Sequence, residues 1–222
     1  MIVEVCANSY ESAINAELGG ANRIELCKDL HLDGLTPDDE VVIKAFNKLK
    51  IPVFILIRPR AGNFVYTNEE FELMKSDIIK FKKQGCNGIV SGILNTNNTI
   101  DLERTKELIQ LSRPLEFTFH RAFDKIVDPI KGLEELIEIG VDRVLTSGQE
   151  DSAIRGIGLI EKLIKIAANR IAIMPGSGVR SVNIKEFIAI GTNEIHGSFS
   201  KNNKTQIEVL EEICYTIKKN GN

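Results

Sequence analysis

The stretch GGANRIELC, residues 19–27, ends one amphipathic segment and starts a short run typical of a buried strand. A glycine suits the left-handed position after a helix, and a following asparagine or aspartate suits the turn into a strand. The same junction occurs four times: Gly20-Ala21-Asn22, Gly85-Cys86-Asn87, Gly140-Val141-Asp142 and Gly191-Thr192-Asn193. A unit of two strands and two helices that recurs four times predicts a closed barrel of eight strands.

Short apolar runs alternate with amphipathic segments along the whole chain. The expected strands are 2–6, 23–27, 53–58, 88–92, 115–120, 143–147, 171–174 and 194–198. The expected helices are 9–19, 38–48, 68–83, 101–111, 128–138, 156–167, 181–189 and 205–218. This alternation favours parallel strands with right-handed crossovers, and we predict a single α/β domain, a TIM-type (βα)8 barrel, over residues 1–222. An open doubly wound sheet is the alternative, because counting strands does not show whether the sheet closes.

The repeat also predicts which side chains face the barrel axis. Ile24, Ile89, Val144 and Ile195 occupy equivalent positions after the four junctions and should face the helices. Because side chains alternate along a strand, the residues on either side of them should point inward. The charged and imidazole side chains of the inward set are Glu4, Arg23, Glu25, Arg58, Glu116, His120, Arg143, Glu194 and His196.

Charges inside a barrel need partners, because removing one unpaired charge from water costs at least several kcal/mol. Four of them start their strands and should form a structural ion-pair network: Arg23, Glu116, Arg143 and Glu194. Glu25, Arg58, His120 and His196 lie nearer the C-terminal strand ends, where barrel enzymes keep their active sites. Among these, Glu25 and His120 are candidate catalytic residues for acid–base chemistry.

The loops after the third, seventh and eighth strands predict an anion site at the same end. The segment RPRAGNFVY (58–66) combines two arginines with a glycine and two aromatic residues. The segments PGSGVRS (175–181) and HGS (196–198) expose backbone N–H groups, and a helix beginning near Ser181 would add positive potential for a phosphate. The candidate substrate-binding residues are Arg58, Arg60, Gly176, Ser177, Gly178, Gly197 and Ser198. Solvated arginines and tight glycine turns are the simpler interpretation of each motif taken alone.

Two of the four cysteines are candidate metal ligands. Cys6 and Cys27 end adjacent strands with the same inward parity. Neighbouring strands lie about 5 Å apart, so the two thiols could share a soft ion such as Cu(I). Barrel stagger could instead place them in different layers. Cys86, in a helix-to-strand turn, and Cys214, on an apolar helix stripe, are expected to fill the core.

The composition argues against several classes of partner. The net charge is −3 with 27% charged residues, and without a basic run that carries aromatic residues we expect no binding to nucleic acid. No apolar stretch approaches the roughly 20 residues needed to span a bilayer. The start MIVEVCANSY is unlike a signal peptide, and cysteines without paired spacing favour a reducing compartment. We therefore expect a cytoplasmic protein without membrane partners.

Seven strings resemble those of the CutC family of copper homeostasis proteins and come in the order of that family. They are EVCANS (4–9), GGANRIELC (19–27), GLTP (34–37), IRPRAGNFVY (57–66), TFHRAFD (118–124), LTSG (145–148) and IMPGSGV (173–179). The resemblance covers roughly residues 2–200 and implies a TIM-type barrel, a cytoplasmic location, self-association as a dimer or tetramer, and a role in handling copper. Within the family pattern, Cys6 and Cys27 match the positions proposed to hold Cu(I). Ser177 departs from the pattern, which more usually has a third glycine there.

Two hypotheses from different classes follow. One is a copper homeostasis protein that binds Cu(I) at the C-terminal mouth of the barrel, supported by the paired cysteines and the resemblance. The other is a barrel enzyme acting on a small anionic or phosphorylated metabolite, supported by the inward charges and the glycine-rich loops. A barrel that serves only as an oligomeric scaffold explains neither set of residues.

Overall fold

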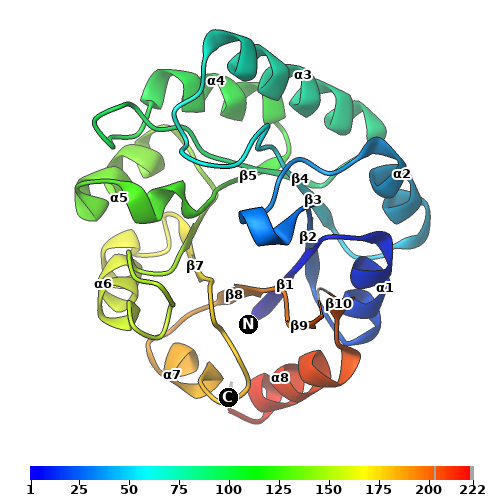
Figure 1. The fold of residues 1–222 in the computed structure, drawn as a ribbon. Helices are drawn as coiled ribbons and strands as arrows, with labels where there is room; N and C mark the ends of the chain where they lie inside the picture. Colours follow the sequence, from blue (N-terminus) through cyan, green and yellow to red (C-terminus); the bar gives the residue numbers. More distant parts are fainter. Residues whose placement is uncertain (203, 221–222) are drawn as a thin grey trace.

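The structure is a computed structural model that describes residues 1–202 and 204–220. Eight parallel strands form a ring that the helices surround (Figure 1). The strands are β1 (Ile2–Ala7), β2 (Arg23–Leu26), β3 (Val53–Leu56), β4 (Gly88–Ser91), β5 (Glu116–Phe119), β6 (Arg143–Thr146), β7 (Ala172–Pro175) and β8 (Glu194–Gly197). Their order around the ring follows the sequence, and β1 pairs with β8. The predicted TIM-type (βα)8 barrel is therefore confirmed.

The outer layer consists of eight α-helices within the described residues. They are α1 (Tyr10–Leu18), α2 (Asp39–Lys48), α3 (Asn68–Gln84), α4 (Leu102–Ser112), α5 (Pro129–Glu138), α6 (Ile157–Ala167), α7 (Ile184–Ala189) and α8 (Ile207–Asn220). The loops add two 3-10 helices, η1 (Leu30–Leu32) and η2 (Arg121–Lys125), and a hairpin of β9 (Ser200–Lys201) and β10 (Lys204–Thr205). Among the described residues no helix has the length and apolar character needed to cross a bilayer.

One helix boundary differs from the prediction. The helix expected from near Ser181 begins at Ile184 and has six residues. A turn precedes it because the Asn183 side chain bonds back to the loop, accepting the Arg180 N–H at 2.8 Å and donating to the Gly178 carbonyl at 2.9 Å. The start of α7 therefore lies further from the glycine-rich loop than the sequence indicated.

At three of its four occurrences, the junction sequence joins an even strand to the strand before it. The Asn22 side chain accepts the N–H of Val3 at 2.8 Å, and the Asn22 N–H donates to the Val3 carbonyl at 2.9 Å. Asn87 and Asp142 make the same pair of bonds to the starts of β3 and β5. The polar residue of the repeat is therefore a strand clamp as well as a turn residue.

The fourth junction lacks this clamp. Asn193 uses its backbone carbonyl to accept the N–H of Ile2 at 2.8 Å, on the β1 side. Within the part of the chain that the structure describes, β7 and β8 contact each other without a hydrogen-bonded ladder. This seam is where the ring closes by packing.

The predicted alternation of faces is confirmed. Apolar side chains from the strands pack with the helices in one large buried core that includes Val3, Val5, Ile24, Ile89, Val144 and Ile195. A second, small cluster lies inside the barrel and consists of Cys6, Cys27, Phe54, Leu56 and Val90. Alternate residues of each strand therefore lie in different environments, one set against the helices and the other inside the barrel, as the period of two requires.

Ion pairs fill the barrel interior near the strand starts. The Arg23 guanidinium donates to Glu4, and through Nη2 to Glu194 at 2.5 Å. Arg143 donates from Nε and Nη2 to Glu194, and from Nη2 to Glu116 at 3.0 Å. This arrangement agrees with the expected structural network, and Glu194 at its centre bonds both arginines.

Removing the charge of Glu194 should destabilise the fold strongly. The Glu194→Gln variant leaves two buried guanidinium groups without a full countercharge, which is expected to lower the free energy of unfolding by about 3 kcal/mol. Glu134→Gln is the matched control, because Glu134 pairs with Arg170 at 2.6 Å on the exposed surface, where water screens the charges. Urea unfolding followed by circular dichroism measures both, and equal effects would contradict the prediction.

Candidate functional site

A cavity of about 760 Å³ opens at the C-terminal ends of the strands. The predicted site residues that line it are Cys6, Glu25, Arg58, His120, Ser177, Gly178, Gly197 and Ser198. Three others lie outside its lining: Cys27, Arg60 and Gly176. Strands and loops far apart in the sequence thus bring most of the predicted residues together at one mouth.

The thiol of Cys6, at the wall of this cavity, contacts the thiol of Cys27, which lies behind the lining. Their Sγ atoms lie 3.4 Å apart, because the parallel pairing of β1 and β2 continues past Leu26, where the Cys27 N–H donates to the Ala7 carbonyl at 3.0 Å. Both cysteines are free and buried. The hydrogen bond between Cys6 and Cys27, then burial and the nearby Glu25 charge, raise the pKa of Cys6 well above its ordinary value, so the Cys6 thiol is protonated when no metal is bound.

His196 completes a cluster of metal-ligating groups that the predicted site residues did not include. One ligand atom each from Cys6, Glu25 and His196 lies within 4.8 Å of the others. The signal in the sequence was the inward parity of His196 on β8, opposite Glu4 in the register. Sequence alone did not show that His196 and Cys6, 190 residues apart in the chain, share one layer of the barrel.

The charges of this cluster are strongly coupled. Burial acts to lower the pKa of His196, but the Glu25 charge and hydrogen bonds to Cys6 and Glu4 outweigh it and raise the pKa well above the ordinary value. Burial raises the pKa of Glu25 against the attraction of His196. Glu4 is the opposite case: burial would raise its pKa, yet Arg23 and His196 hold it at about 2. Glu4 is therefore a carboxylate at neutral pH.

His120 is a buried, neutral hydrogen-bond donor at the cavity wall. Its Nδ1 accepts the Ala122 N–H at 3.1 Å, which caps η2 and leaves the proton on Nε2. Among the described residues that Nε2 has no partner. Burial and then the Arg58 charge lower the pKa of His120 to about 3. The ring therefore suits hydrogen bonding to a ligand better than proton transfer near neutral pH.

Arg58 and Arg60 organise loops. The Arg58 Nη1 donates to the carbonyls of Leu32 and Gly34 at 2.7 and 2.8 Å, and its Nη2 donates to Gly62 at 3.1 Å. Arg60 pairs with Glu70 at 2.6 Å, away from the cavity lining. The arginine pair after β3 therefore secures the loops around the mouth, and the cations that line the cavity besides Arg58 are Arg121, Lys125 and Arg180.

The glycine-rich loops after β7 and β8 lie at the mouth, but their hydroxyls are already bonded within the protein. Ser177 Oγ donates to the Asp151 carbonyl at 2.9 Å, and Ser198 Oγ lies 3.0 Å from Ser200 Oγ. Gly176 has a packing role, because a Cβ atom there would lie 2.5 Å from Leu145 Cδ1. A ligand in these loops would therefore be held through backbone N–H groups.

Asp124 explains why HRAFD and LTSG occur together. Its buried carboxylate accepts bonds from Thr146 Oγ1 at 2.5 Å and from the Ser147 N–H and hydroxyl at 3.0 and 2.9 Å. Arg121 Nε adds an ion pair at 2.9 Å. Sequence analysis missed this structural role, which ties the loop after β5 to the loop after β6.

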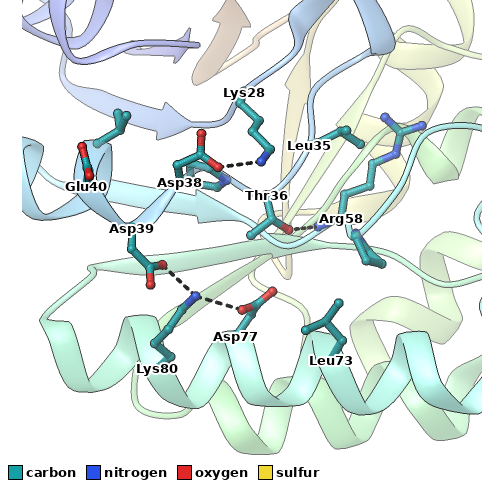
Figure 2. Close-up of a pocket in the computed structure, with 13 residues that line it drawn as sticks. Lys28, Leu35, Thr36, Asp38, Asp39, Glu40, Arg58, Leu73, Asp77 and Lys80 are labelled. Atoms are coloured by element: carbon teal, nitrogen blue, oxygen red, sulfur yellow. Dashed lines mark hydrogen bonds and ion pairs between the residues drawn. The ribbon is translucent and has the colours of Figure 1, made fainter.

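A second cavity, of about 620 Å³, lies on the outside of the barrel. Figure 2 shows that its cations face carboxylates: Lys28 pairs with Asp38 at 2.6 Å, and Lys80 with Asp39 and Asp77 at 2.7 and 3.1 Å. The Arg58 side chain extends away from these pairs. Both lysines of this cavity are thus paired with carboxylates, and the barrel mouth is the better candidate site.

The fold and the mouth define a (βα)8 barrel with a buried cluster of thiol, imidazole and carboxylate groups. Solved structures with little sequence similarity share this barrel: an aldolase, QR15, has a TM-score of 0.69 at 14% identity over 97% of this chain and 94% of its own. A thiamine phosphate pyrophosphorylase from Pyrococcus furiosus has a TM-score of 0.66 at 13% identity, over 98% and 96% of the two chains. These similarities establish the fold alone.

The particular family follows from closer relatives. The profile described as "CutC family" matches residues 1–201. The copper homeostasis protein cutC homolog of Homo sapiens is 46% identical over 198 residues, which is 89% of this chain and 72% of that protein. A family protein CutC of Parabacteroides distasonis is 45% identical, covering 89% and 82%. A crystal structure described as a candidate copper homeostasis protein CutC from Streptococcus agalactiae superposes with a TM-score of 0.85 at 34% identity, over 89% and 98% of the two chains. This chain belongs to the CutC family.

The low pKa of His120 predicts how stability depends on pH. The unfolded chain binds a proton on His120 near pH 6.5, whereas the folded protein keeps the ring neutral to about pH 3. Because the unfolded state binds more protons between these values, the free energy of unfolding should fall with pH below 6.5, by up to about 1.4 kcal/mol per unit from this residue.

The His120→Asn variant is the control, because asparagine keeps an acceptor for the Ala122 N–H and does not titrate. Urea unfolding of both proteins at several pH values gives the two slopes. The variant should lose stability less steeply below pH 6.5 than the wild type, and parallel slopes would show that His120 titrates normally in the folded protein.

Proposed function

We propose that this protein binds Cu(I) between Cys6 and Cys27 at the C-terminal mouth of the barrel and acts in copper homeostasis. The observation that carries the proposal is the 3.4 Å separation of two buried, reduced thiols. Cu(I) prefers thiolate ligands and tolerates low coordination, so two cysteines are chemically sufficient. Two relatives, from Homo sapiens and Mus musculus, are named copper homeostasis protein cutC homolog, which supports the same role.

The surroundings of the thiols set the strength of copper binding. The raised pKa of Cys6 means that copper must displace a proton from this thiol. The neighbouring carboxylate of Glu25 opposes thiolate formation and suits a harder cation better. We therefore propose measurable but moderate Cu(I) affinity, lower than that of a dedicated copper carrier.

Two further properties belong to this proposal. We place the protein in the cytoplasm, where free thiols such as these stay reduced. Self-association as a dimer or tetramer remains a prediction of the family resemblance. Cys86 and Cys214 have no part in the site, because Cys86 is buried in the core beside the helices and Cys214 lies on α8.

Competition with a coloured Cu(I) chelator under reducing conditions tests the copper site. The Cys6→Ser, Cys27→Ser double variant should lose copper to the chelator at least about 100-fold more readily than the wild type, because hydroxyls are poor ligands for a soft ion. Cys86→Ser and Cys214→Ser serve as matched controls and should behave like the wild type. A double variant that holds copper as tightly as the wild type would refute the assignment.

A barrel enzyme acting on a small anionic or phosphorylated metabolite is the second candidate function. It is favoured by the unpartnered Nε2 of buried His120 at a cavity large enough for a metabolite. In this proposal Glu25, with its raised pKa, is the acid–base candidate. The neutral ring of His120 would donate a hydrogen bond, and the backbone of residues 176–178 and 197–198 would hold the anion.

Phosphate binding followed by phosphorus NMR or calorimetry tests the anion site. The Gly178→Val variant should weaken phosphate binding about tenfold or more, a loss of about 1.4 kcal/mol, because a side chain would cover the exposed turn. Gly191→Val is matched for backbone strain, since both glycines have positive φ, 77° and 82°. It precedes the start of β8, away from the mouth, and should leave phosphate binding unchanged. Wild-type protein that binds no phosphate would remove the support for this candidate.

A further inference from the structure

A hydrogen bond at Nδ1 fixes the orientation of the His196 ring. Its Nδ1 lies 2.8 Å from Glu4 Oε1. Because Glu4 forms a buried ion pair with Arg23, its carboxylate accepts the bond and the Nδ1–H is the donor. The opposite ring nitrogen, Nε2, lies 3.5 Å from Glu25 Oε2, and a ligand atom of the ring lies within 4.8 Å of the Cys6 thiol. The ring therefore offers Nε2 to the cluster at the cavity.

Glu4 is itself held rigidly. Its side chain is fully buried and accepts a charge-assisted bond from Arg23 on the neighbouring strand. In the β1–β8 register Glu4 is directly opposite His196. A histidine whose Nδ1–H donates to a carboxylate, and whose Nε2 coordinates once the metal displaces its proton, is the arrangement that proteins use to orient and strengthen metal-binding imidazoles.

Cys6, Glu25 and His196 together form a ligand set for a divalent ion. They supply one sulfur, one nitrogen and one carboxylate oxygen within 4.8 Å of each other. Ligand atoms around a tetrahedral zinc ion lie roughly 3.3–3.6 Å apart, given Zn–S near 2.3 Å and Zn–N or Zn–O near 2.0–2.2 Å. The separation of 3.5 Å between His196 Nε2 and Glu25 Oε2 already fits this spacing, and small rotations of the side chains would bring Cys6 into range.

The cluster also has an open side. Cys6, Glu25 and His196 are each less than 10% exposed, yet all three line the cavity of about 760 Å³. A bound ion would therefore have three protein ligands and one position facing the cavity. This coordination is typical of catalytic zinc, where the open position takes water or an anionic ligand.

We propose that Cys6, Glu25 and His196 form a site for a single divalent cation of the zinc class, with Glu4 as the positioning residue for His196. This site goes beyond the Cu(I) proposal, because it uses imidazole and carboxylate ligands and does not use Cys27. The two sites share Cys6, so one ion excludes the other. The fourth position of the divalent ion takes a small anion or water from the cavity.

Titration of the metal-free full chain with Co²⁺ tests the proposal, with Zn²⁺ then added as competitor. Co²⁺ bound at this site should give a sulfur-to-metal charge-transfer band together with the intense visible bands of four-coordination, and Zn²⁺ should abolish both. Cys6→Ser should lose the sulfur band. Glu25→Gln and His196→Gln should each weaken Co²⁺ binding at least about 100-fold.

Cys27→Ser and Glu4→Gln separate this site from its alternatives. Cys27→Ser should keep the Co²⁺ spectrum and affinity within about threefold of the wild type, while it loses Cu(I). Glu4→Gln should weaken Co²⁺ binding about tenfold and shift the visible bands, because a neutral acceptor makes His196 a weaker donor. Circular dichroism identifies any variant that does not fold, and Glu25→Gln then carries the test alone.

The outcomes distinguish the two metal proposals. Absence of a sulfur band in the wild type, or unchanged Co²⁺ affinity in folded Glu25→Gln, overturns the divalent site whether or not Cu(I) binds. A loss of Co²⁺ in Cys27→Ser equal to that in Cys6→Ser also overturns it, since the ion would then lie between the thiols. Tight Co²⁺ binding with the expected variants supports the divalent site even if the wild type binds no Cu(I).

Discussion

The carboxylate of Glu4 connects the two halves of the barrel interior. It accepts bonds from Arg23, which belongs to the ion-pair network near the strand starts, and from His196, which belongs to the cluster at the mouth. Burial would favour a neutral Glu4, but the Arg23 and His196 charges outweigh it and keep the group ionised. An interior filled with charges instead of branched apolar residues is stable only because each charge has a partner of this kind. The geometry of the mouth therefore depends on the network below it.

The mouth combines groups of different chemical hardness around one cysteine. Toward Cys27, Cys6 is half of a thiol pair suited to a soft monovalent ion. Toward Glu25 and His196, it is part of a mixed ligand set suited to a divalent ion. The same cavity carries the unpartnered Nε2 of His120. In the two proposals, the ion bound at the mouth depends on which of these neighbours coordinates it together with Cys6.

Several motifs that resemble those of the family form hydrogen bonds within and between the loops around the cavity. Arg58 bonds three loop carbonyls, and Asp124 joins the loops after β5 and β6. These contacts hold loops that would otherwise move, so that the groups facing the cavity keep fixed positions. Arg60, which the sequence placed in the substrate site, has the same kind of role in the loop before α3.

The sequence by itself determined the alternation of eight strands with eight helices and the inward or outward face of the strand residues. The reason is that the junction repeat and the period of two are local properties of the chain. The closure of the sheet into a barrel was shown by the pairing of β1 with β8. Only the tertiary structure decided which inward groups meet. Cys6 and Cys27 lie at the ends of strands adjacent in sequence, which allowed their thiols to meet without showing that they share a layer. His196 joins Cys6 because β8 closes against β1. The alternation of side chains along a strand shows whether a residue points into the barrel. Its height along the barrel axis depends on the stagger between strands in the closed barrel. The partners of Arg58 and His120 likewise depend on loop paths that no local pattern specifies.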